Sequence, residues 1–249
     1  MIRIDQSIQR FLKPWIILLT CILMVGCYIY FDKQIAVALY RANLAQHIPL
    51  LRTITFLGSS ALYLVMLFIL ASIFRGISCV KGVHIKSPQL RSRYYWIFPN
   101  FNSVSEARVW FLITALTFAD LVCGVLKCLL GRARPMLWIN QQQFGFYWFK
   151  IKPDYWSFPS GHTTTIMSLA IGLSVLFPRF TKVFLFLAVC IVISRVLLVQ
   201  HYVSDVLATT LLVLVEMGFL LGFLSNKQWL AEAWPMQLAV RSAKGGKTK

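Results

Sequence analysis

Three short polar clusters interrupt the apolar second half of the chain. Together they supply three cations, two histidines and one carboxylate. Several fixed cations suit an anion with several oxygens, phosphate more than carboxylate. Histidine can act as an acid or base near neutral pH, or as a nucleophile. The clusters contain Lys127 and Arg134, then Ser160, Gly161 and His162, and finally Arg195, His201 and Asp205.

The turn Ser160–His162 combines residue types that favour an anion site at the start of a helix. Ser160 is a strong N-cap residue, and Gly161 lets a ligand approach the backbone closely. The helix that follows offers unpaired N–H groups and the positive end of its dipole. We therefore expect the turn to bind an anion and His162 to move a proton onto or off it.

Residue spacing in the other two clusters indicates shared helical faces. Lys127 and Arg134 are nearly two turns apart, so they share a face if the helix continues past Gly131. His201 and Asp205 are four residues apart and share a face of one helix. A carboxylate that accepts from one ring nitrogen leaves the other nitrogen basic and directed outward. That arrangement suits a histidine that acts as a nucleophile or a base.

The elements that carry these clusters are expected to be membrane helices. Hydrophobic residues make up 58% of the chain and charged residues 13%, whereas soluble proteins carry about 25% charged residues. Six apolar stretches approach the roughly 20 residues that cross a bilayer. The sequence therefore predicts an all-α fold, a polytopic membrane helical bundle with about six transmembrane helices, in a single domain over residues 1–249. The stretches are Trp15–Phe31, Ile54–Phe74, Trp110–Leu130, Ser160–Phe177, Val183–Val199 and Val203–Leu224.

The net charge of +17 would suggest a nucleic-acid partner in a soluble protein. In a membrane protein it reports topology, because cytoplasmic loops are enriched in Lys and Arg. With the N-terminus inside, sixteen of the 25 Lys and Arg residues fall on the cytoplasmic side, including a basic tail at 226–249. We expect no nucleic-acid partner and an N-in, C-in chain.

In this topology all three polar clusters reach the opposite, outer surface. Any single cation near a helix end could simply extend its side chain to the interface. The arrival of three cations, two histidines and an aspartate at one surface is not explained that way. Two further acids, Asp120 and Glu216, fall inside apolar stretches. We expect both to face the bundle, each bonded to a neighbouring helix, because a carboxylate facing hydrocarbon is costly.

The complete pattern resembles the signature of the type 2 phosphatidic acid phosphatase family, also called the lipid phosphate phosphatase/haloperoxidase superfamily. That signature has three parts, K-x6-RP, PSGH and SR-x5-H-x3-D. The signature region, residues 127–205, covers about a third of the chain, and the first hundred residues contribute only apolar spans. This sequence has Lys127-x6-Arg134-Pro135, then Pro159-Ser160-Gly161-His162, then Ser194-Arg195-x5-His201-x3-Asp205.

The resemblance implies a role for each residue of the signature. His201 would attack phosphorus and form a phosphohistidine, and Asp205 would orient His201. His162 would protonate the leaving oxygen and then activate the water that frees phosphate. Only eight Asp and Glu residues occur, scattered singly, so we expect no metal site and no cofactor. The phosphoryl oxygens would be held by Lys127, Arg134, Arg195 and the backbone N–H groups of Ser160 and Gly161.

The function implied by the resemblance is hydrolysis of a phosphomonoester or diphosphate on a membrane lipid. Phosphatidic acid, phosphatidylglycerol phosphate, an isoprenyl diphosphate and lipid A 1-phosphate all fit. A membrane phosphotransferase that passes the phosphoryl group to a second lipid would use the same histidine. Vanadium haloperoxidases of the superfamily are typically soluble, and a transporter would carry its charges near the midplane, so both are disfavoured.

The compact loops resemble bacterial members, which implies the inner membrane with the site facing outward. The sequence predicts no oligomeric state.

Overall fold

The computed structural model describes residues 13–48, 50–80 and 104–225. The basic tail predicted at 226–249 lies outside the described residues. Within them the regular structure is helical, apart from one isolated bridge between Arg132 and Phe146. The helices are α2 (Pro14–Gly26), the π-helical turn η1 (Cys27–Phe31), α3 (Asp32–Ala42), α4 (Leu44–His47), α5 (Leu50–Phe56), α6 (Ser60–Val80), α7 (Val104–Leu130), α8 (Pro135–Gln141), η3 (Pro153–Tyr155), α9 (Gly161–Leu176), η4 (Pro178–Phe180), α10 (Thr181–Leu197) and α11 (Val203–Ser225).

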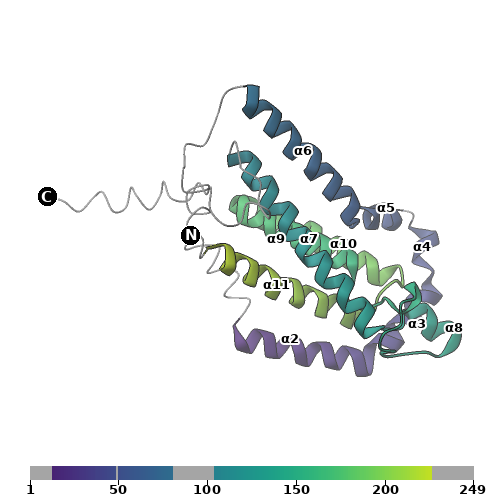
Figure 1. Ribbon diagram of the computed structural model, residues 1–249. Coiled ribbons are helices and arrows are strands. Elements are labelled where there is room, and N and C mark those ends of the chain that lie inside the picture. The colour runs from purple at the N-terminus through teal and green to yellow at the C-terminus, as the bar shows by residue number, and fades with distance from the viewer. Residues whose placement is uncertain (1–12, 49, 81–103, 226–249) are drawn as a thin grey trace.

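The long helices lie side by side in a bundle, as Figure 1 shows, and α3, α4, α5 and α8 gather at one end of it. Five helical segments of the described chain are long and apolar enough to cross a membrane, and α9 is a shorter apolar helix. The prediction of a polytopic helical membrane bundle is confirmed. The five segments are Pro14–Ala42, Ser60–Ile77, Arg108–Leu130, Pro178–Leu197 and Val203–Phe223.

Two predicted spans differ from the helices in the structure. The first helical segment continues past Phe31 through α3, although α3 begins with two charged residues. The second predicted span, Ile54–Phe74, is broken. Its first residues belong to α5, and α6 begins only at Ser60. The intervening Gly58 N–H bonds to the Thr55 carbonyl oxygen at 3.0 Å, as in a turn. Hydropathy could not detect this break, because apolar residues lie on both sides of it.

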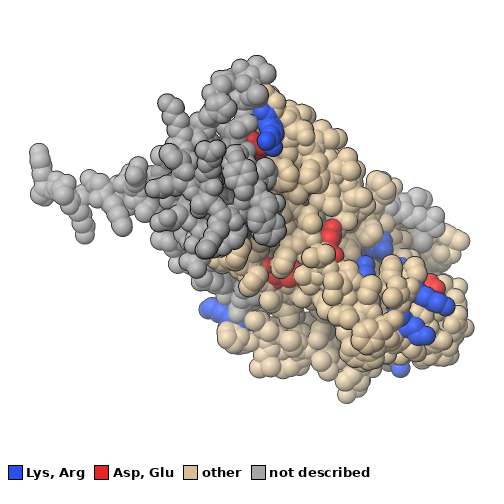
Figure 2. Space-filling view, viewed as in Figure 1, with Lys and Arg blue, Asp and Glu red and all other residues tan. Residues whose placement is uncertain are grey.

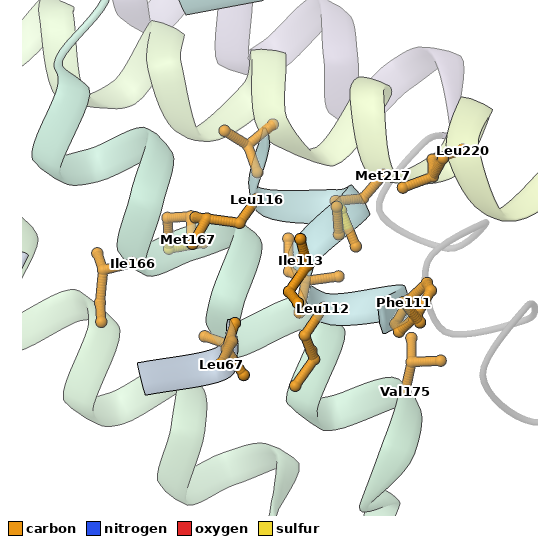
Figure 3. Packing of buried hydrophobic residues seen from close by; sticks show 14 of the residues in the cluster. Leu67, Phe111, Leu112, Ile113, Leu116, Ile166, Met167, Val175, Met217 and Leu220 are labelled. Carbon is orange, nitrogen blue, oxygen red and sulfur yellow. The ribbon is translucent and has the colours of Figure 1, made fainter. Parts of the chain in front are cut away.

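Helix α9 forms the centre of the bundle. It packs against α6, α7, α10 and α11, and eleven of its 16 residues are buried. Figure 3 shows Ile166 and Met167 of α9 near Leu116 of α7, within the main apolar cluster. The hydroxyls of Thr164 and Thr165 bond to carbonyl oxygens one turn back, each at 3.0 Å. These two hydroxyls therefore keep a hydrogen bond although their side chains are buried.

Charge is distributed unevenly along the bundle. Figure 2 shows that, among the coloured residues of this face, Lys and Arg gather toward the two ends and are missing from the middle. The middle of this face is mostly tan, with red Asp and Glu atoms at two places in it. At one end, the cations surround the region where α3 and α8 lie in Figure 1. This end carries the polar clusters found in the sequence.

The two acids within apolar stretches differ in their contacts. Asp120 of α7 accepts a hydrogen bond from the Thr165 hydroxyl of α9 at 3.3 Å, so the prediction of an interhelical bond is confirmed for Asp120. Glu216 of α11 is buried, with 6% of its surface exposed. Its two carboxyl oxygens have no hydrogen-bond partner within the described residues. For Glu216 the predicted burial is confirmed, and the predicted bond to a neighbouring helix is wrong.

Candidate active site

The first cluster is built by a sharp turn after α7. Helix α7 ends at Leu130, and Gly131 adopts the left-handed φ of +56°. A Cβ atom on Gly131 would lie 2.9 Å from the Tyr147 carbonyl oxygen, so only glycine fits there. The helix therefore does not persist from Lys127 to Arg134, and a common helical face does not explain their pairing. The turn brings the two cations into the site from separate segments.

Backbone and side-chain contacts fix the position of Arg134. It is the N-cap residue of α8, with Pro135 at the first helical position. Its N–H donates to the Asp154 carbonyl oxygen at 2.9 Å. Its guanidinium donates from Nη1 to Oε1 of Gln200 at 3.1 Å. Because Gln200 directly precedes His201, this bond connects the first cluster to the third.

The second cluster is the N-terminus of α9, as its sequence predicts. The Ser160 side chain accepts from the Thr163 N–H at 3.4 Å and from the Thr163 hydroxyl at 3.0 Å. The Ser160 N–H, however, donates to the Thr209 hydroxyl of α11 at 3.0 Å. Ser160 is fully buried, so its N–H holds α9 against α11. The structure therefore does not offer the Ser160 N–H to a phosphoryl oxygen, in contrast to the role implied by the signature.

Gly161 brings the first two clusters together. A Cβ atom at Gly161 would lie 3.0 Å from Nζ of Lys127. The ammonium group thus sits directly beside the first residue of α9, in space that any side chain at Gly161 would occupy. The cation and the positive end of the helix dipole act on the same small region, which suits a bound anion.

The α5–α6 turn contributes two contacts that the sequence motifs did not indicate. The guanidinium of Arg195, a buried side chain of α10, donates from Nη1 to the Thr55 hydroxyl at 2.8 Å. His162 lies against Gly58, where an added Cβ would be 2.8 Å from Cδ2 of the ring. Thr55 and Gly58 therefore position a cation and a histidine of the signature. The sequence signal was the short run Gly58-Ser59-Ser60, within a stretch that reads as a membrane span.

His201 lies in the loop before α11, and its ring is held by a backbone carbonyl. Its Nδ1 is 2.6 Å from the Ser157 carbonyl oxygen and 3.9 Å from Oδ2 of Asp205. A carbonyl oxygen can only accept, so Nδ1 carries the proton and Nε2 carries the lone pair. Asp205 instead accepts from the Ser157 hydroxyl at 2.6 Å. Because α11 begins at Val203, His201 and Asp205 do not share a helical face, and each of them bonds to Ser157.

The electrostatic surroundings keep the His201 ring neutral. Burial lowers its pKa well below the usual value, and the charges of Arg195, Arg134 and Lys127 lower it further. The bond to the Ser157 carbonyl oxygen acts in the opposite direction. The same three cations lie within electrostatic range of His162. The structure therefore brings cations of the first and third clusters within electrostatic range of both His201 and His162.

Arg132 is a further component of the site that sequence reasoning did not identify. It is 2% exposed. Its Nη1 lies 2.5 Å from Oδ1 of Asp205, and its Nη2 lies 2.8 Å from Oδ2 of Asp32 on α3. Its guanidinium carbon also lies between 4.9 and 5.9 Å from the centroids of four aromatic rings. The rings are those of Tyr28, Phe144, Phe146 and Tyr202.

The histidines and acids of the described residues do not form a metal-binding group. No three or more His, Cys, Asp or Glu side chains lie together there in a way that could hold an ion. The polar atoms that face the anion region come instead from cations and from imidazole. This donor set suits an oxyanion.

Comparison with known proteins found one family model and two curated relatives that match part of the chain. Residues 108–229 match the model of the PAP2 superfamily. A lipid A 1-phosphatase from Rhizobium etli is 37% identical over 98 residues, and one from Rhizobium johnstonii is 36% identical over 98 residues. These alignments cover 39% of this chain and 42% and 40% of the relatives, so the chain matches less than half of their length.

A solved membrane protein can also be superposed on the chain. It is described as the first transmembrane PAP2-type phosphatidylglycerolphosphate phosphatase from Bacillus subtilis. The superposition covers 84% of this chain and 94% of that chain, with 18% identity and a TM-score of 0.47.

Proposed function

We propose that this chain, whose residues 108–229 match the model of the PAP2 superfamily, is a membrane phosphatase that removes phosphate from a lipid. The observation that carries the proposal is the convergence of Lys127, Arg134 and Arg195 on His201. Catalysis of phosphoryl transfer rests mainly on positioning and on neutralising the charge of the equatorial oxygens. Three cations beside a neutral imidazole meet both needs.

In the proposed reaction, Nε2 of His201 attacks phosphorus while the bond from phosphorus to the lipid oxygen breaks. A proton carried by His162 goes to that leaving oxygen. Water then attacks the phosphohistidine and gives its proton to His162, and the phosphorus–nitrogen bond breaks to release phosphate. The Nδ1–H bond to Ser157 supports this sequence, because it leaves the lone pair on Nε2. Lys127, Arg134, Arg195 and the Gly161 N–H are proposed to hold the phosphoryl oxygens.

Lipid A 1-phosphate is the substrate that we favour among the lipid phosphates that fit the site. The support is the similarity to two proteins named lipid A 1-phosphatase, over 98 residues each. We further propose that the chain lies in a bacterial inner membrane, N-in and C-in, with the site facing outward. The charge bias of the loops supports this orientation. A phosphate group made on the inner face would then have to be flipped before hydrolysis, since a phosphate dianion is prohibitively costly to bury in hydrocarbon.

The proposed function is tested by phosphate release from pure lipids by the purified full chain in detergent. The panel is phosphatidic acid, phosphatidylglycerol phosphate, an isoprenyl diphosphate and lipid A 1-phosphate, and we expect the fastest release from the last. His201→Ala should abolish release, whereas His47→Ala should not, because His47 is an exposed histidine on α4 outside the site. Labelled phosphate should be trapped on the wild type and not on His201→Ala. If none of the four lipids releases phosphate, the proposed function is wrong.

A further inference from the structure

A buried chain of charged and polar groups runs behind His201. Asp32 and Asp205 both bond to Arg132, and all three residues are at most 2% exposed. Asp205 accepts from the Ser157 hydroxyl, and the Ser157 carbonyl oxygen accepts from Nδ1 of His201. Asp32 is therefore connected to the proposed nucleophile through three intermediate residues.

Asp32 also holds the start of the helix that carries Asp205. Its Oδ1 accepts from the Ser204 N–H at 3.1 Å, and its Oδ2 accepts from the Ser204 hydroxyl. The Tyr202 N–H in turn donates to Oδ2 of Asp205 at 2.9 Å. One carboxylate from α3 thus caps the first turn of α11, as an N-cap side chain would, and fixes the segment that follows His201.

The charges of this group do not cancel. Asp32, Arg132 and Asp205 together carry one net negative charge when all are ionised. Arg132 and Asp205 alone would be neutral. The contribution of Asp32 is therefore to leave one uncancelled negative charge in this group, whose Asp205 carboxylate lies 3.9 Å from Nδ1 of His201.

We propose that Asp32 and Arg132 are positioning residues for His201: they fix Asp205 and Ser157 behind the ring and maintain a net negative charge there. The reaction makes this charge useful. When Nε2 of a ring protonated at Nδ1 bonds to phosphorus, the ring becomes cationic. A preorganised negative charge stabilises that cation, and it acts strongly in a site without water. The kinetic part of this inference rests on the proposed function, but the binding test below does not.

The test compares Asp32→Asn with Glu216→Gln, which also replaces a buried carboxylate by its amide, on α11 and away from this group. We expect Asp32→Asn to lower kcat at least about tenfold while KM stays within about twofold. Asp32→Glu should recover part of kcat. Glu216→Gln should retain wild-type kcat, because neither carboxyl oxygen of Glu216 has a hydrogen-bond partner within the described residues. Unchanged kcat in Asp32→Asn would overturn the proposal.

Binding of two inorganic anions separates positioning from a merely structural role, with no need for turnover. Vanadate can take Nε2 of His201 as a fifth ligand and so makes the ring cationic, whereas inorganic phosphate binds to the cations alone. Asp32→Asn should weaken vanadate binding about tenfold and leave phosphate binding within about twofold. Equal weakening of both anions would indicate a structural role and overturn the proposal. A wild type that binds both anions but hydrolyses no lipid would refute only the proposed function.

Ser157→Ala keeps the inference testable if Asp32→Asn does not fold. This variant removes the hydroxyl that bonds to Asp205 and keeps the carbonyl oxygen that holds His201. We expect the same selective loss of vanadate binding, because Asp205 no longer anchors that carbonyl group. Ser168→Ala is the matched control, since Ser168 is a buried serine of α9 whose hydroxyl has no hydrogen-bond partner within the described residues. If Ser157→Ala and Ser168→Ala bind vanadate equally well, the proposal is wrong.

Discussion

The Gly58→Ala substitution should lower turnover by displacing His162. The added Cβ would lie 2.8 Å from Cδ2, 3.1 Å from Cγ and 3.0 Å from Cβ of His162. Ordinary contacts begin at 3.4 Å, so the nearest atom must retreat by about 0.6 Å. The ring cannot simply rotate away, because the Cβ atom of His162 is also too close. The N-terminus of α9 or the α5–α6 turn must move.

The size of the effect follows from this displacement. A misplacement of about 1 Å in a catalytic group costs about 100-fold in rate, so a shift of about 0.6 Å should lower kcat roughly tenfold. KM should change less, since the three atoms nearest to the added Cβ all belong to His162. Gly58 is not in the left-handed conformation, so alanine adds no backbone strain. The assay is phosphate release from the best lipid of the panel, with kcat and KM determined separately.

Two other glycines provide matched controls. At Gly172, an added Cβ would lie 2.8 Å from Cδ2 of Leu112 in the core, so Gly172→Ala creates a similar overlap away from the site. It should lower the melting temperature and leave kcat per folded molecule unchanged. At Gly124, nothing lies within 4 Å of an added Cβ, and Gly124→Ala should alter neither quantity adversely. If Gly58→Ala and Gly124→Ala have the same kcat, the contact between Gly58 and His162 does not position a catalytic group.

Three further predictions concern inhibitors, pH and orientation. Vanadate should compete with the lipid substrate, and EDTA should have little effect; strong inhibition by EDTA that Mg²⁺ reverses would contradict a metal-free reaction. Because folding lowers the pKa of His201, a falling pH protonates His201 in the unfolded chain before it does so in the folded chain. The free energy of unfolding should therefore decrease as the pH drops below about 6.5, and the melting temperature of His201→Gln should depend less on pH. In a background without native cysteines, an impermeant thiol reagent applied to intact cells should label Asn140→Cys and spare Arg179→Cys, both of which are exposed positions. The reverse labelling would place the site on the cytoplasmic side.

The sequence predicted those features that depend on local patterns. Membrane spans follow from runs of apolar residues, because the hydrocarbon thickness sets their length. The convergence of Lys127, His162 and Arg195 followed from counting spans, since each span reverses the direction of the chain. Neither inference needs the packing of one helix against another. For this reason both are unaffected by errors of several residues in where a helix begins or ends.

Helix boundaries limited the predictions for individual side chains. The pairing of His201 with Asp205 assumed one continuous helix, but α11 begins at Val203, and the imidazole is held by Ser157 from a segment 44 residues earlier. Gly58 was placed inside a span because the stretch around it is mostly apolar, although Ser59 and Ser60 follow it. In both cases a difference of a few residues in a helix boundary changes which groups are in contact, and composition alone cannot resolve such a difference.

The buried charge of Arg132 could have been found by asking how it is neutralised. A guanidinium group in a low-dielectric interior is too costly to bury without a carboxylate partner. The chain has only eight Asp and Glu residues, so few partners exist, and Asp205 of the signature is one of them. Spacing rules could not supply the second, because Asp32 lies 100 residues from Arg132 along the chain. Asp205 alone neutralises the charge of Arg132, so charge balance does not explain why Asp32 also bonds to Arg132. The presence of Asp32 is explained if the negative charge is required by His201, which becomes cationic only during the reaction.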